Sequence, residues 1–176
     1  MNLFKEINDD LKAAKRFSLT NKAIIFFFNR GFHALLFYRF SNLFYRCKIP
    51  LLPSILTRIV QVLYGIDIDF KAQIKGGIVI VHGVGLVVGS GVIIQPDVIL
   101  FHGVTLGRRG VGPVISPSDG YPAIERGCII CTGAVLLGNI KIGENTTIGA
   151  NCLITTNIAA NSVCKLPDNH FVINNK

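Results

Sequence analysis

A repeat with a period of six residues constrains the fold of this chain more than any other feature. Aliphatic residues return at every sixth position in two series: Ile68, Ile74, Ile80, Leu86, Val92, Val98 and Val104, then Ile124, Ile130, Leu136, Ile142, Ile148 and Ile154. A helix repeats every 3.6 residues and a half-buried strand every two, so neither produces this spacing. Hexapeptide repeats are a known period of the parallel β-helix. The spacing predicts one short strand and one corner per repeat, with about five coils stacked at the ~4.8 Å strand separation.

The fourth position after the aliphatic residue supports this prediction. It is mostly small or β-branched, as at Ala72, Val84, Ser90, Cys128, Ala134, Thr146 and Cys152. The 18 glycines also fit a fold with many tight corners, because glycine adopts positive φ without strain. We therefore expect a mainly β protein, with a parallel β-helix over residues 65–165 and a tail over residues 166–176.

Residues 1–64 have a different character and predict an α-helical segment. They are rich in Phe and carry ten Lys and Arg against three acids, which accounts for most of the net charge of +8. The longest apolar run, Ala23 to Phe28, is far below the ~18 residues that a membrane-spanning helix needs. These helices are therefore expected to be amphipathic. One interpretation is that they pack on the solenoid or on other subunits; the other is that residues 21–64 also rest on an anionic membrane face. Either arrangement is compatible with covering the open end of the first coil.

Composition excludes several other classes of protein. Five cysteines, an odd number, argue against a disulfide framework, and Cys128-x-x-Cys131 is interpreted as structural because no second pair accompanies it. The N-terminal residues lack the apolar stretch of a secretory signal, so we expect a cytoplasmic protein, peripheral on the inner face of the membrane if the helices touch lipid. Nucleic acid is not an expected partner, because the cations are interleaved with Phe in amphipathic helices.

The repeat is interrupted once, between Gly107 and Ala123. Val104 and Ile124 are 20 positions apart instead of 18, and the intervening residues are rich in Gly and Pro. This composition predicts an irregular loop, residues 107–123, extruded from a corner. Long loops in an otherwise regular repeat are more often functional than decorative.

Two histidines at predicted corners, His82 and His102, are the candidates for chemistry, whereas His33 is expected to be packed and satisfied. Asp67 lies 15 residues before His82, on the adjacent coil near the neighbouring corner. A carboxylate there could orient one ring nitrogen and leave the other as a general base. No metal site is expected, because the chain has no close pair of histidines with a third one to complete it.

Four stretches carry a resemblance to a known family: GFHALLFYR (31–39), GIDIDFKAQIKGGIVIVHGVGLVVG (65–89), HGVTLG (102–107) and GCIICTGAVLLGNIKIG (127–143). They resemble serine acetyltransferases and, equally, the short acetyltransferases of that family encoded with surface-polysaccharide pathways. The resemblance implies a left-handed parallel β-helix, a homotrimer and acetyl-CoA bound between neighbouring solenoids. It also implies that His82 is the general base and Asp67 its orienting partner. The positions implied for acetyl-CoA are Gly107, Arg108, Thr132, Gly133 and Ala150, with Lys165 as a weaker phosphate contact.

The acceptor side departs from the serine acetyltransferase pattern. Val81 stands where the family has a carboxylate, Gly120 and Tyr121 replace an Arg-His pair in the loop, and Lys15, Arg16 and Phe17 occupy the place of a helical aspartate. We therefore expect Val81, Tyr121 and His102 to face an acceptor other than serine, namely a sugar hydroxyl of a surface polysaccharide or its precursor. The alternatives are a serine O-acetyltransferase of cysteine biosynthesis and an inactive trimeric scaffold.

Overall fold

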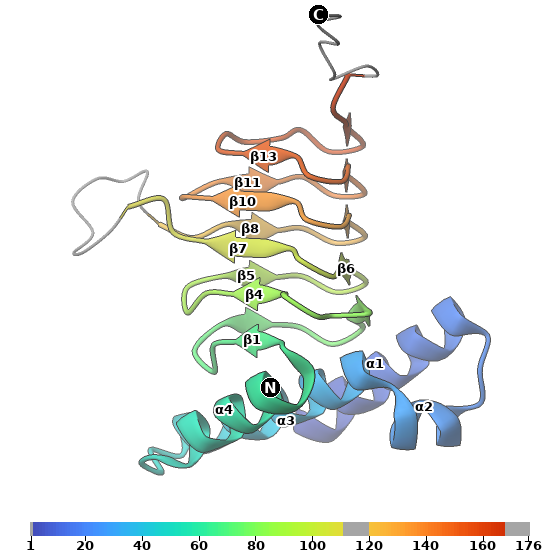
Figure 1. Cartoon of the computed structure of the whole chain (residues 1–176), viewed down its shortest axis with the longest axis vertical. Helices are drawn as coiled ribbons and strands as arrows, with labels where there is room; N and C mark the ends of the chain where they lie inside the picture. The colour runs from blue at the N-terminus through green and yellow to red at the C-terminus, as the bar shows by residue number, and fades with distance from the viewer. Residues whose placement is uncertain (1, 111–119, 168–176) are drawn as a thin grey trace, which may run out of the picture.

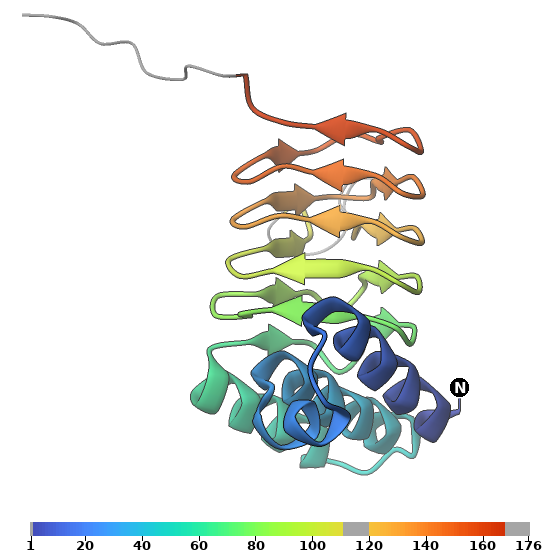
Figure 2. The same cartoon turned by 90° about the vertical axis from the view of Figure 1, so that its right-hand side faces the viewer.

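A parallel β-solenoid stands on a layer of four helices in the computed structural model (Figures 1 and 2). The structure describes residues 2–110 and 120–167, so most of the loop and most of the tail lie outside the described residues. The helices are α1 (Leu3–Ser18), α2 (Lys22–Phe28), α3 (Arg30–Arg46) and α4 (Leu52–Tyr64). They precede the solenoid in the chain and cover the end formed by its first coil. This architecture confirms the prediction of a parallel β-helix with an N-terminal helical segment.

The short strands stack into three parallel sheets, each with four or five members. The first sheet contains β1 (Asp67–Ile68), β4 (Val87–Val88), β7 (Thr105–Gly107), β10 (Val135–Leu137) and β13 (Leu153–Ile154). The second contains β2 (Gln73–Ile74), β5 (Ile93–Ile94), β8 (Ala123–Ile124) and β11 (Lys141–Ile142). The third contains β3 (Val79–Val81), β6 (Ile99–Phe101), β9 (Ile129–Ile130), β12 (Thr147–Ile148) and β14 (Val163–Cys164).

The strand pairing shows that the coils are not all of one length. Ile68 pairs with Val88, 20 positions later, whereas Val88 pairs with Leu106, 18 positions later. The two additional residues lie in the corner between β3 and β4. The uninterrupted series from Ile80 to Leu86 was therefore wrong in detail, because it crosses this insertion. As a consequence Val84 is exposed instead of being a small buried corner residue.

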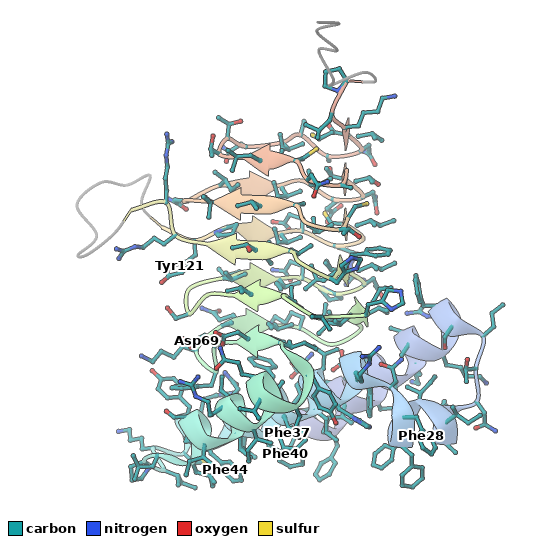
Figure 3. All side chains as sticks on the ribbon, in the orientation of Figure 1. Phe28, Phe37, Phe40, Phe44, Asp69 and Tyr121 are labelled. Atoms are coloured by element: carbon teal, nitrogen blue, oxygen red, sulfur yellow. The ribbon has the colours of Figure 1, made fainter. Side chains whose placement is uncertain are left out.

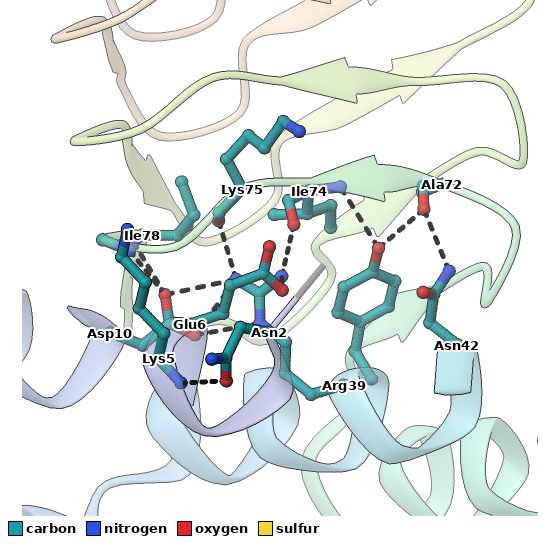
Figure 4. A network of polar contacts seen from close by, with 12 residues as sticks. Asn2, Lys5, Glu6, Asp10, Arg39, Asn42, Ala72, Ile74, Lys75 and Ile78 are labelled. Carbon is teal, nitrogen blue, oxygen red and sulfur yellow. Dashed lines mark hydrogen bonds and ion pairs between the residues drawn. The ribbon is translucent and has the colours of Figure 1, made fainter. Parts of the chain in front are cut away.

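A buried ionic network attaches the helices to the first coil (Figure 4). Arg39 of α3 is fully buried, and its guanidinium donates to Asp10 at 3.1 Å and to Glu6 at 3.2 Å, both on α1. The same guanidinium donates to the backbone carbonyls of Ile74 and Lys75. A buried cation is tolerated only when it is paired and hydrogen-bonded, so α1 and α3 are held against this coil as a unit.

Other polar side chains of α3 occupy the exposed edge of the first coil. The Tyr38 hydroxyl donates to the carbonyl of Ala72 at 2.6 Å, and the Asn42 amide donates to that of Phe70 at 2.7 Å. These bonds replace those that a further strand would make, which is how an open sheet edge is protected from pairing with another chain. None of the helices in the described residues is long and apolar enough to span a membrane.

Candidate active site

Two of the edges of the solenoid carry the predicted site residues. The edge at which the third sheet turns into the first is formed by residues 82–86, 102–104, 131–134 and 149–152, and we call it the histidine edge. The edge at which the first sheet turns into the second includes residues 89–92 and both ends of the extruded loop, and we call it the loop edge. The first sheet lies between the two edges.

His82 projects from the lengthened corner of the first coil. It leaves β3 with a positive φ of 64°, a conformation that is uncommon for a residue with a side chain, and its side chain is exposed. The next residue is Gly83, where an added Cβ would lie 2.5 Å from Cδ1 of Ile66. The insertion and the glycine together turn the backbone inward and leave the imidazole outside.

His102 occupies the equivalent position one coil further along. Because Val81 pairs with Phe101 in the sheet, the two histidines that follow them are neighbours, with ring centroids 5.9 Å apart and planes at 73°. Nδ1 of His102 is buried and is the one such side-chain atom in the described residues without a hydrogen-bond partner. An unpaired buried polar atom is costly, so a ligand or neighbouring subunit that reached this nitrogen would relieve that cost.

Asp67 lies at the same edge as His82, but the predicted hydrogen bond between them is not formed within the described part of the chain. Asp67 begins β1 and pairs with Val87 in the first sheet. Its carboxylate accepts a hydrogen bond from Nε2 of Gln61 on α4 at 3.3 Å. The structure therefore brings the two residues to one edge and connects the carboxylate to the helical layer.

A cavity of about 260 Å³ opens beside His82, between the solenoid and the helices. It exists because Gly31 lets the start of α3 approach β3: a Cβ at Gly31 would lie 2.2 Å from the carbonyl oxygen of Ile80. Its lining includes Phe17, Phe28, Arg30, Val81 and His82. Val81 was predicted to face the acceptor and Phe17 to stand in the place of a helical aspartate, whereas Arg30 and Phe28 were not among the predicted residues.

The sequence marks the start of the helix that begins at Arg30, but not that this residue lies near His82. Asn29 accepts a hydrogen bond from the backbone N–H of Phe32 at 2.8 Å, which is the N-cap arrangement that begins a helix. Such a signal locates the helix start, but the proximity of Arg30 to His82 depends on how α3 packs. Buried Asp10 also lines this cavity, and desolvation raises the pKa of its carboxyl to about 6, although Arg39 and the N–H groups of Ile78 and Gly77 oppose the shift.

Three of the residues predicted for acetyl-CoA continue the histidine edge above His102. The N–H of Gly133 donates to the carbonyl of His102 at 3.0 Å, and that of Asn151 donates to Thr132 at 2.9 Å, so Thr132 and Ala150 stack in the column of the two histidines. Gly133 has a positive φ of 67°, which favours glycine, and a Cβ there would lie 2.3 Å from Oδ1 of Asn151. These small residues leave an open strip along the edge.

The remaining predicted positions separate into two groups. Lys165 lies against Gly149 at the far end of the histidine edge, with its Cα 3.2 Å from an ideal Cβ on that glycine. Gly107 and Arg108 lie at the loop edge, on the other side of the first sheet, where Arg108 donates to the carbonyl of Gly110 at 3.1 Å. In one chain, therefore, Gly107 and Arg108 lie apart from the other residues predicted to bind acetyl-CoA.

Tyr121 also belongs to the loop edge and not to the neighbourhood of His82. Its ring packs over Gly89 and Gly91, and its hydroxyl accepts a hydrogen bond from Ser90 at 3.0 Å. The loop residues 111–119 lie outside the described residues. An acceptor contact by Tyr121 with His82 would therefore have to be made between two chains.

His33 and the cysteines are explained by hydrogen bonding and burial. The imidazole of His33 is hydrogen-bonded on both nitrogens, to Tyr64 at 3.0 Å and to the carbonyl of Phe26 at 2.8 Å, which confirms that it is a satisfied residue. All five cysteines are free thiols, and burial raises the pKa of Cys128 and Cys131. Within residues 2–110 and 120–167, no group of three His, Cys, Asp or Glu could hold a metal ion.

Comparisons with known proteins identify relatives of this chain. Residues 121–156 match the family model "Bacterial transferase hexapeptide (six repeats)". The chain is 33% identical over 160 residues to the serine acetyltransferase of Buchnera aphidicola, which covers 90% of this chain and 60% of that relative. It is 32% identical over 142 residues to the serine acetyltransferase of Helicobacter pylori, covering 81% of each. Among solved structures, the serine acetyltransferase of Neisseria gonorrhoeae in complex with serine superposes with a TM-score of 0.83 at 28% identity, over 92% of this chain and 65% of that one.

These relatives correct one expectation. The acceptor was expected to be a sugar hydroxyl of a surface polysaccharide, because the serine-binding positions at Val81, Gly120 and Tyr121 differ from the family pattern. The similar proteins are serine acetyltransferases, so the polysaccharide interpretation is wrong and the alternative of a serine O-acetyltransferase is the one supported. Differences at three acceptor positions do not define a new acceptor when other side chains can bind the same groups.

Proposed function

Because the chain belongs to the serine acetyltransferase family, we propose that it transfers the acetyl group of acetyl-CoA to the hydroxyl of L-serine. The observation that carries this proposal is the position of His82, an exposed imidazole at a strained corner, between a cavity and a strip of small residues. The cavity suits a small acceptor and the strip suits an extended donor, so both substrates would meet at this imidazole.

His82 is the proposed general base. It removes the proton from the serine hydroxyl, whose oxygen attacks the thioester carbonyl and forms the new ester bond. As the carbon–sulfur bond breaks, protonated His82 returns that proton to the leaving thiolate. Transfer is direct, and no acetyl group is attached to the protein. General base catalysis by a positioned imidazole contributes roughly 10²–10⁴-fold to the rate.

Arg30 is the proposed partner of the serine carboxylate. Arg30 lines the same cavity as His82, and a planar guanidinium can bind a carboxylate through two parallel hydrogen bonds. Phe17 and Phe28 line the cavity as well, and an aromatic face attracts an ammonium group. The cavity thus offers one contact for the carboxylate of serine and another for its ammonium group, although Val81 replaces the family carboxylate.

The proposed assembly is a homotrimer with acetyl-CoA between adjacent solenoids. Val84 and Val87 are exposed next to His82, and large apolar side chains in such a place favour coverage by another surface. A neighbour that presented its loop edge here would bring Gly107, Arg108 and Tyr121 of one chain to the histidine edge of another.

The test is acceptor profiling with release of free CoA as the readout. Acetyl-CoA is offered with L-serine, with N-acetyl-L-serine, which lacks the ammonium group, and with L-serine methyl ester, which lacks the carboxylate. We expect turnover with L-serine that falls sharply for both analogues and for a His82→Asn variant. Absence of L-serine-dependent CoA release by the folded wild-type protein would overturn the proposal.

A further inference from the structure

The short helix α2 presents an apolar stripe to solvent. Ile24, Phe27 and Phe28 follow the spacing of one helix face and are 52%, 66% and 77% exposed. Ile25 alone of this helix is buried, at 2% exposure. Phe26 is 44% exposed as well, so this seven-residue helix buries one large side chain and exposes four. Monomeric proteins seldom expose such a patch without a partner.

Ile24 and Phe27 do not line the His82 cavity, whereas Phe28, at the end of the stripe, borders it. Figure 3 shows Phe28, Phe40 and Phe44 on the helical layer below the first coil. Phe40 of α3 is 37% exposed, so the aromatic character continues across the layer. We call the surface formed by Ile24, Phe27 and Phe40 the aromatic base.

Positive charge accompanies the aromatic base. Of the three acids among residues 1–64, Glu6 and Asp10 are occupied by Arg39, and Asp9 is 4.0 Å from Lys12. Lys22 begins the helix that carries the stripe and is exposed, as are three cations near the α3–α4 connection, Arg46, Lys48 and Arg58. The base therefore combines apolar side chains with uncompensated cations.

The apolar side chains and the cations together indicate which partner could cover the aromatic base. A second copy of the chain would bring like charges together, which is unfavourable in a desolvated contact. A layer of anionic lipid headgroups accepts both elements, because Phe and Ile enter the interface while Lys and Arg pair with phosphates. We propose that the aromatic base is a membrane-contact surface that holds the protein peripherally on anionic phospholipid, which would place it at the inner face of the cytoplasmic membrane.

The proposed trimer would strengthen this contact. The helices lie at one end of the solenoid (Figure 1), so copies arranged side by side with parallel solenoids would turn three bases toward one plane. Linked contacts of this kind bind far more tightly than one alone. Binding by a single base does not depend on the trimer or on the acetyl acceptor.

The experiment is flotation of the full chain with lipid vesicles. Vesicles of phosphatidylglycerol and phosphatidylcholine are compared with vesicles of phosphatidylcholine alone, at low and high salt. The test variant Ile24→Gln/Phe27→Gln alters two exposed residues that do not line the His82 cavity. Removing residues 1–30 instead would be uninformative, because it would leave Arg39 buried without Asp10 and Glu6. The matched control is Val163→Gln/Leu166→Gln, which removes exposed apolar groups at the opposite end of the solenoid.

We expect the wild type and the control to float with anionic vesicles, and the test variant to lose about tenfold or more in partitioning. High salt should weaken binding, and neutral vesicles should bind little. Acetyl transfer and the melting temperature should be the same in the test variant as in the wild type. Wild-type protein that does not float, or a test variant that floats equally well, would overturn the proposal. So would a test variant that only lowers the oligomeric state in light scattering, since the base would then be a contact between copies.

Discussion

The imidazole of His82 lies against that of His102, edge to face, with 5.9 Å between the ring centroids. The two residues are 20 positions apart in the chain and meet because β3 and β6 are paired in register. His82 is exposed, whereas Nδ1 of His102 is buried without a partner. His82, the proposed general base, thus has a second imidazole beside it. The strip of small residues begins on the far side of that second imidazole.

His102→Phe tests the contribution of that second imidazole. Phenylalanine keeps an aromatic ring beside His82 but removes both nitrogens, so packing is preserved and hydrogen bonding to substrate is lost. Because a hydrogen bond to a bound group is worth about 1 kcal/mol or more, we expect kcat/KM for acetyl transfer to fall about tenfold while the melting temperature stays unchanged. His102→Gln, which can still hydrogen-bond, should be impaired less. Wild-type activity in His102→Phe would show that His102 acts through packing alone.

Ala150→Tyr tests whether the histidine edge binds the donor. Ala150 is exposed in the column above Thr132, so a large side chain there would fill the strip without entering the core. We expect the KM for acetyl-CoA to rise by about tenfold or more, since displaced contacts in a narrow site cost a few kcal/mol. The KM for serine should change little. Ala160→Tyr adds the same bulk at an exposed position on another edge and serves as the control. A similar KM in both variants would argue against donor binding at the histidine edge.

Arg30→Ala tests the proposed contact with the serine carboxylate. Charge-assisted hydrogen bonds contribute about 1.5–3 kcal/mol, so we expect the KM for L-serine to rise roughly 10–100-fold while that for acetyl-CoA stays constant. Arg58→Ala makes the same change on the exposed face of α4 and should leave both constants unaltered. An unchanged KM for serine in Arg30→Ala would show that the serine carboxylate is bound by another group.

Asp10→Asn tests the ionic network beneath the first coil. Burial raises the pKa of Asp10 from 3.8 to about 6, so the folded state binds a proton more tightly than the unfolded chain. The resulting stabilisation is present below pH 4 and is lost as the pH rises through 6, amounting to about 3 kcal/mol. The melting temperature of the wild type should therefore fall relative to that of Asp10→Asn by roughly 5–10 °C between pH 4 and 7.

The control for this titration is Asp97→Asn. Asp97 forms surface ion pairs with Arg16 and Arg126, and exposed pairs of this kind contribute little to stability. Its pH profile should follow that of the wild type. If Asp10→Asn also follows the wild-type profile, the pH dependence arises elsewhere.

The sequence by itself determined the solenoid and its interior. Residues such as Ile124, Ile130 and Leu136 lie at a period that a parallel coil satisfies, and all three are fully buried. It also identified the two corner histidines, because few polar residues interrupt the apolar pattern. Such a period is a local property, readable from neighbouring residues without knowledge of how distant ones meet.

Only the tertiary structure decided what surrounds His82. The insertion between β3 and β4 changes the length of one coil, and this length decides which corner residues stack, so the pairing of His82 with His102 could not be read from spacing alone. The proximity of Arg30 depends on Gly31 letting α3 approach β3, which is a contact between elements some 50 positions apart. The helical layer also leaves the α2 stripe outside, because Arg39, Tyr38 and Asn42 direct the other face of the layer to the first coil.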